Sequence, residues 1–135
     1  AYNIGVFEIK IGKLDEKKSQ NPKVKELAAM MIKDHTDLGK DVTALMQKKN
    51  VQTPADLPSD LKSAWDDLNK LSGKEFDKKY ADINVNGHKD AISLFTEVSK
   101  GSKDDDVSKL AADALPVLQK HEDHSTMLLA SVSGQ

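Results

Sequence analysis

The stretch that decides the fold is residues 21–50, which read NPKVKELAAMMIKDHTDLGKDVTALMQKKN. Asn21 followed by Pro22 predicts the start of a helix, because an Asn side chain can accept hydrogen bonds from the free amides of a first turn and Pro is favoured at the first helical position. Apolar residues then recur every three or four positions, which is typical of a helix with one buried face. They are Val24, Leu27, Met31, Leu38, Val42 and Leu45. The pattern predicts a long helix that ends near Asn50.

The same spacing on either side predicts more helices. An apolar stripe before residue 17 predicts a first helix of about 15 residues that ends in the polar run 17–20. Residues 51–73 change character, with two prolines and then a short periodic set. We expect a crossover here that carries one short helix, with Trp65 covering one end of the core. The residues of these two stripes are Ile4, Phe7, Ile11 and Leu14, and then Leu61, Trp65, Leu68 and Leu71.

Two long helices are expected in the second half of the chain. Ser72 with Glu75 three residues later predicts a capping box at the start of one, and Gly101 predicts its end. Three consecutive acids, residues 104–106, would suit the N-terminus of the last helix, where negative charge is stabilised. Pro116 lies inside that helix and predicts a kink.

These elements predict an all-α chain. Two short connections and one long crossover indicate a ferritin-like, antiparallel four-helix bundle with one short extra helix in the crossover. A chain of 135 residues can bury one core without disulfides or a structural metal, so we expect residues 1–135 to form a single domain.

The composition excludes several kinds of function. All 20 basic residues are Lys, so the guanidinium fork that reads phosphate and guanine is missing, and 22 acidic residues balance them. We therefore expect no nucleic-acid partner. No stretch approaches the length of an apolar membrane span, and the absence of Cys excludes thiolate chemistry. The chain begins at Ala1 without Met, and we expect an export signal to have been removed.

Four polar residues interrupt the apolar stripes, each in a different predicted long helix: Glu8, His35, His88 and His121. Burying such groups without partners costs about 1–3 kcal/mol each, so they are the most informative positions in a bundle. The histidines lie near the middle of their helices and can meet at a similar depth. Three imidazoles and one carboxylate suit one divalent transition metal ion, Zn²⁺ first, or Fe, Cu or Mn with added solvent.

Other assignments remain open at this point. His124 lies three residues after His121 on one helix face, and the two can form their own two-nitrogen clip. Asp77 and Tyr80 are also three residues apart, and are either outer partners that orient the ligands or a surface carboxylate and a core aromatic. The Glu-x-x-His pattern of di-iron proteins is absent before each His, which argues against ferroxidase chemistry.

Three motifs in this order resemble a bacterial cell-envelope family of unknown function, domain-of-unknown-function family 4142, whose members are often labelled "putative outer membrane protein". They are Met31-Ile32-Lys33-Asp34-His35-Thr36, then Phe76-Asp77-x-x-Tyr80 followed by His88, then Leu115-Pro116-x-Leu118-x-x-His121. The resemblance spans about residues 4–129. It implies a ferritin-like domain in an exported, periplasmic or envelope-associated protein.

Three functions follow as hypotheses. The first is a binding module that holds one metal ion through Glu8 and the three histidines. The second is a structural or interaction protein whose inward polar residues form a metal-free hydrogen-bonded network. The third, an enzyme with an open metal position, has the least support, because no catalytic motif marks a substrate site.

Overall fold

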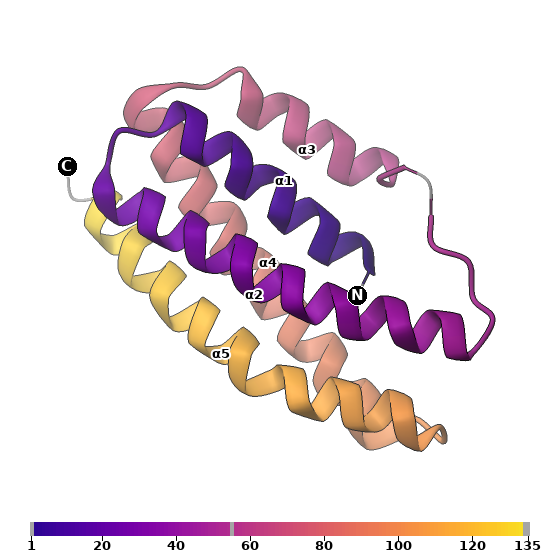
Figure 1. The fold of residues 1–135 in the computed structure, drawn as a ribbon. Helices are drawn as coiled ribbons and strands as arrows, with labels where there is room; N and C mark the ends of the chain where they lie inside the picture. The colour runs from indigo at the N-terminus through magenta and orange to yellow at the C-terminus, as the bar shows by residue number, and fades with distance from the viewer. Residues whose placement is uncertain (1, 55, 134–135) are drawn as a thin grey trace.

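The computed structural model describes residues 2–54 and 56–133, and this part of the chain contains five α-helices and no strand (Figure 1). The helices are α1 (Tyr2–Lys18), α2 (Pro22–Lys48), α3 (Ser59–Asn69), α4 (Gly73–Gly101) and α5 (Asp105–Ser133). The prediction of an all-α chain with four long helices and one short helix is confirmed.

The long helices pack as a helical bundle. Short connections join α1 to α2 and α4 to α5, and each pair lies side by side in opposite directions (Figure 1). The long connection after α2 carries α3, which lies along the outside of α1 before the chain returns to α4. Lys18 at the end of α1 donates hydrogen bonds to the carbonyl oxygens of Asn69 and Leu71, which ties this connection to the bundle.

Local sequence signals explain where two of the helices begin. The Asn21 side chain accepts a hydrogen bond from the Lys23 amide at 3.0 Å, and Pro22 occupies the first turn of α2, as predicted. The Asp104 carboxylate accepts from the amides of Asp106 and Val107 at 3.0 and 3.3 Å. The acidic run therefore caps α5 directly.

The predicted capping box at the start of α4 is wrong. Ser72 is the residue before the helix, but its side chain makes no capping hydrogen bond. Gly73 begins the helix with φ of +60°, a backbone turn that the capping box does not contain. At Pro116 α5 continues as a helix, and the kink there stays a prediction.

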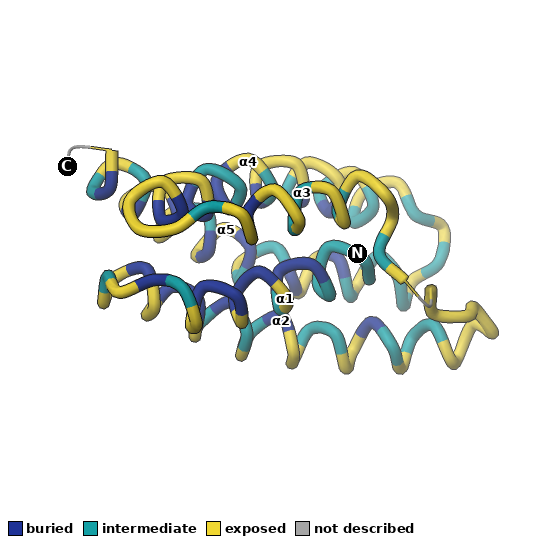
Figure 2. The backbone as a smooth tube through the Cα atoms, turned by 90° about the horizontal axis from the view of Figure 1, so that it is seen from above, coloured by how far each residue is buried: buried dark blue, intermediate teal, exposed yellow. Residues whose placement is uncertain are grey.

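Two apolar clusters fill the bundle at different levels. One is formed mainly by the first half of the chain with the start of α4 and the end of α5, and includes Phe7, Ile11, Met31, Phe76 and Leu128. The other lies between the end of α4 and the start of α5, and includes Ala91, Phe95, Ala111, Ala114 and Leu118. Buried positions recur along the sides of the helices that face their neighbours (Figure 2). None of the described helices has an apolar stretch long enough to cross a membrane.

Gly12 explains how closely α1 approaches α2. A Cβ atom at this position would lie 2.8 Å from Cγ1 of Ile32 and 3.3 Å from the carbonyl oxygen of Ala28. These distances are below ordinary van der Waals contact, so a side chain at this position would displace Ile32 or push the two helices apart.

Candidate metal centre

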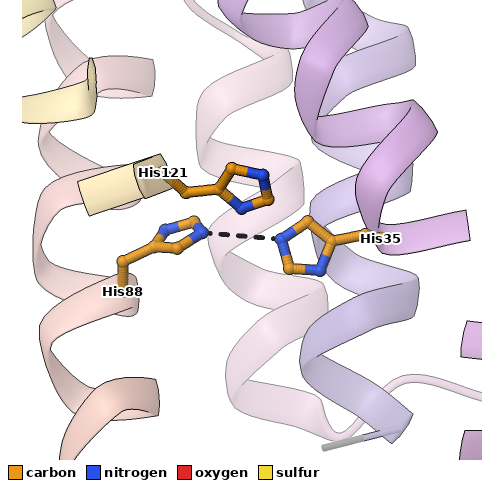
Figure 3. A group of neighbouring side chains, drawn as sticks. All are labelled: His35, His88 and His121. Atoms are coloured by element: carbon orange, nitrogen blue, oxygen red, sulfur yellow. Dashed lines mark hydrogen bonds between the residues drawn. The ribbon is translucent and has the colours of Figure 1, made fainter. Parts of the chain in front are cut away.

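Three histidines from three helices meet between the two apolar clusters. His35 of α2 follows Met31 of the first cluster by one turn, and His121 of α5 follows Leu118 of the second by three residues. With His88 of α4, their side chains point toward one another in the core (Figure 3). They are 2%, 2% and 0% exposed, and one nitrogen of each lies within 4.8 Å of the others.

The orientation of His88 is fixed by its own helix. Its Nδ1–H donates a hydrogen bond to the carbonyl oxygen of Asn84, one turn earlier, at 2.8 Å. Since a neutral imidazole carries one proton, the lone pair is on Nε2. That atom lies 3.5 Å from Nε2 of His35 (Figure 3). His88 therefore offers a lone pair to the interior.

The orientation of His121 is fixed by a different helix. Its Nε2–H donates to Oδ2 of Asp34 on α2 at 2.7 Å, and the Lys120 ammonium lies 3.1 Å from the same oxygen. The other ring nitrogen of His121, Nδ1, is buried and has no hydrogen-bond partner. The lone pair left over by this contact is thus on Nδ1.

His35 has one nitrogen in the group and one outside it. Without a metal ion its Nε2 can donate a proton to the lone pair of His88, which accounts for the 3.5 Å contact. Its Nδ1 is buried without a partner.

Burial keeps the three rings neutral at physiological pH. It lowers the pKa of His35 to about 3, and the neighbouring charges of His121 and His88 act in the same direction. Burial also lowers the pKa of His88 to about 4, although its hydrogen bond to Asn84 acts the other way. The pKa of His121 is lowered by burial too, against the influence of Asp34. Neutral imidazole is the form that binds metals.

The spacing suits a shared ion. Two nitrogens bound at about 2.0–2.1 Å to a tetrahedral Zn²⁺ lie about 3.3–3.4 Å apart. The 3.5 Å between the Nε2 atoms of His35 and His88 is close to this value, and a ring nitrogen of His121 lies within 4.8 Å of both of these residues' ligand atoms. Three such ligands leave a fourth position for water, a carboxylate or an exogenous ligand.

Glu8, the predicted fourth ligand, is buried near this group but outside it. It is 2% exposed, and its Oε2 has no partner. Its Oε1 lies 3.8 Å from where a Cβ of Gly87 would be, which places the carboxyl beside the turn of α4 that carries His88. Burial raises its pKa to about 8, so it is mostly protonated at neutral pH while no cation is near.

The other predicted residues lie elsewhere. His124 is exposed and is not part of the group. Asp77 accepts a hydrogen bond from the Ser19 hydroxyl at 2.7 Å, close to the buried Asp15. Tyr80 stacks on Phe76, and its backbone carbonyl accepts a hydrogen bond from the Asn84 side chain. The described contacts join neither Asp77 nor the Tyr80 hydroxyl to a histidine.

The residue that does orient a histidine, Asp34, was missed by the sequence analysis. Burial opposes its ionisation, but hydrogen bonds from His121 and Lys120 hold its pKa below the usual value. The sequence feature that could have identified Asp34 is its position directly before His35 in the first motif. Nothing in the periodicity of α2 indicated that it faces α5.

Comparison with known proteins gives a family and no nearer relative. No curated protein and no solved structure matches the chain. The family described as "Domain of unknown function (DUF4142)" matches residues 1–128, a range that holds Asp34 and all three histidines of the site. Because the match covers nearly the whole sequence, the chain belongs to this family.

Proposed function

We propose that this protein is a metal-binding helical bundle of the bacterial cell envelope, which holds one divalent transition metal ion through His35, His88 and His121. The observation that carries the proposal is the meeting of three buried, neutral imidazoles from three helices, with one nitrogen of each within 4.8 Å of the others.

Unpartnered atoms favour a metal site over a purely structural network. Native proteins pair the large majority of their buried polar atoms, because each orphan costs about 1–3 kcal/mol. Nδ1 of His121 lies beside two other imidazoles and has no hydrogen-bond partner for its lone pair, and Oε2 of Glu8 nearby has no partner either. A network selected only to fix helix register should satisfy these atoms. A cation supplies the missing partner.

Zn²⁺ is the ion that we propose first. Neutral imidazoles are borderline ligands that suit Zn, Cu, Fe and Ni, and the chain offers no thiolate that would select softer ions. Three histidines with an open position also match a common arrangement of catalytic zinc. Fe, Cu and Mn are alternatives that elemental analysis can distinguish from Zn.

Glu8 is proposed as the fourth ligand. It comes from α1, so a metal bound by all four residues would join all four long helices. Its carboxyl lies beside Gly87 and outside the present group of nitrogens, so coordination requires its side chain to move toward them. A cation within reach would favour the ionised carboxylate and offset the cost of burying it.

The fold and the location are part of the proposal. Four long helices with one long connection between α2 and α4 support a ferritin-like plan, in which metal ligands project inward from facing helices. The periplasmic or envelope location rests on the family resemblance.

The test is elemental analysis of protein purified without a metal-chelating tag, after incubation with Zn²⁺, Cu²⁺, Fe²⁺ or Mn²⁺ and removal of the excess. We expect about one ion per chain in the wild type and a loss of this ion in His35→Ala, His88→Ala and His121→Ala. His124→Ala is the matched control, because it removes an exposed imidazole from the same helix as His121, and it should retain the ion. Binding of no ion, or equal binding by all variants, would leave the hydrogen-bonded network as the function of these residues.

A further inference from the structure

One charged residue touches the histidine group without belonging to it. Asp34 lies on α2 directly before His35, yet its carboxylate contacts α5, where it accepts the Nε2 proton of His121 at 2.7 Å. Two consecutive residues of α2 thus contact different histidines, because Asp34 contacts His121 and His35 contacts His88.

The contact determines which nitrogen of His121 carries the proton. A carboxylate oxygen can only accept, so Nε2 must be the protonated nitrogen and Nδ1 must hold the lone pair. Nδ1 is the atom that is buried without a partner. On α4 the backbone does the same for His88 with the opposite result, since the Asn84 carbonyl takes the Nδ1 proton and leaves Nε2 free.

We propose that Asp34 is a positioning residue that fixes His121 as the Nε2–H tautomer, so that this ring binds the metal through Nδ1 while His35 and His88 bind through Nε2. The inference rests on the proposed function. It adds a residue that does not bind the metal itself. It also predicts that one histidine binds through Nδ1 and two through Nε2, which the metal proposal alone does not require.

The alternative coordination through Nε2 of His121 is disfavoured, because it would break the hydrogen bond from His121 to Asp34. The ring would lose its 2.7 Å hydrogen bond, and the Asp34 side chain, which is only 18% exposed, would keep a single charged partner, Lys120. Leaving a partly buried carboxylate short of hydrogen bonds costs free energy. A carboxylate behind a metal-bound imidazole also makes the ring a stronger ligand, and loss of such a partner lowers metal affinity about 10–100-fold.

Lys120 has a supporting part in this arrangement. Its ammonium lies 3.1 Å from the same Asp34 oxygen and precedes His121 in the chain. α5 therefore presents two donors, one from each of two consecutive residues, to one carboxylate oxygen. This clamps the side chain of Asp34 against the helix that carries the histidine.

The test is long-range ¹H–¹⁵N correlation of protein labelled with ¹⁵N in its imidazole rings, recorded without metal and with one equivalent of Zn²⁺. Without metal, we expect His121 to show the pattern of the Nε2–H tautomer. With Zn²⁺, the coordination shift should fall on Nδ1 of His121 and on Nε2 of His35 and His88. Asp34→Ala should mix the tautomers of His121 and weaken Zn²⁺ binding about 10–100-fold, and Asp34→Glu should restore part of both.

Asp37→Ala is the matched control, because Asp37 is an exposed acid one turn further along the same helix. It should change neither the tautomer nor the affinity. A coordination shift on Nε2 of His121, or an unchanged tautomer in Asp34→Ala, overturns this inference and leaves the proposed function standing. If Zn²⁺ shifts no imidazole nitrogen at all, the proposed function fails and the inference fails with it.

Discussion

The Nε2 atoms of His35 and His88, which are 53 residues apart in the chain, lie 3.5 Å from each other in the core of the bundle. At this separation the two atoms can share one proton or bind one ion, but they cannot do both. Since Nδ1 of His88 already donates to Asn84, the proton between the rings must come from His35. Metal binding therefore has to replace a hydrogen bond that joins α2 to α4.

The first prediction concerns the stability that a metal adds. Because the ligands come from three helices, Zn²⁺ should bind the folded chain and not the unfolded one, and at a free concentration of 100 times Kd it should add about 2.7 kcal/mol. For a chain of this length that corresponds to a rise in Tm of about 10 °C, measurable by differential scanning calorimetry. His88→Ala should show no rise, whereas an equal rise in His88→Ala and wild type would contradict the site.

Much of the fold followed from local signals. Asn21 and Pro22 start a helix by capping chemistry that involves only neighbouring residues, and α4 ends at Gly101, so both boundaries were predictable from the local sequence. The three histidines were found because each interrupts an apolar stripe. That pattern shows which polar groups are buried, but not which of them touch.

The residues that were missed depend on tertiary contacts. Asp34 lies off the buried stripe of α2 and gains its role only because α5 packs there. Asp15 lies beside the predicted core residue Leu14, and its carboxyl is buried in the fold near Asp77 of α4 and Lys25 of α2, which the sequence pattern of α1 does not reveal. The failed capping box at Ser72 has a backbone cause, the positive φ of Gly73, which residue types alone do not reveal.

The second prediction tests the close approach of α1 and α2. Gly12→Ala should destabilise the protein by about 1–3 kcal/mol, because the new Cβ would lie 2.8 Å from Ile32. Gly39→Ala is the matched control on α2, where nothing lies within 4 Å of the new atom, and it should stabilise by about 0.5–1 kcal/mol through helix propensity. Chemical denaturation of both variants measures the difference. Equal effects of the two substitutions would contradict the tight contact.

The third prediction concerns pH and the buried carboxyl of Asp15, which is 0% exposed and has no hydrogen-bond partner on either oxygen. Its pKa is raised to about 8, mainly by burial and also by the charges of Asp77 and Glu16, against the opposing charge of Lys25. In the unfolded chain an Asp has a pKa of about 3.9. Between these values the folded protein holds a proton that the unfolded chain has lost, so this group makes stability fall as pH rises through that window.

Asp15→Asn should remove this dependence, because a carboxamide resembles the protonated acid. The slope of the unfolding free energy against pH should change by up to about 1.4 kcal/mol per pH unit between pH 5 and 7.5, with the variant the more stable protein at pH 7.5. Asp90→Asn, an exposed acid on α4, should leave the slope unchanged. Urea unfolding at several pH values decides the matter, and parallel curves for Asp15→Asn and wild type would rule out a buried, protonated Asp15.

The fourth prediction decides whether Glu8 is a metal ligand. In the metal-free protein the Glu8 carboxyl is neutral at pH 7, since burial raises its pKa to about 8, so Glu8→Gln should change metal-free stability by less than about 1 kcal/mol. With Zn²⁺ present the two side chains differ, because a carboxamide is a much poorer ligand than a carboxylate. We expect Glu8→Gln to bind Zn²⁺ more weakly at unchanged stoichiometry, as measured by isothermal titration calorimetry.

Proton release on Zn²⁺ binding also tests whether Glu8 is a ligand. Coordination by Glu8 must expel its proton, so the wild type should release about one more proton per ion than Glu8→Gln at pH 7. Equal affinity and equal proton release would leave three histidines and an open fourth position, to which water or an exogenous ligand binds.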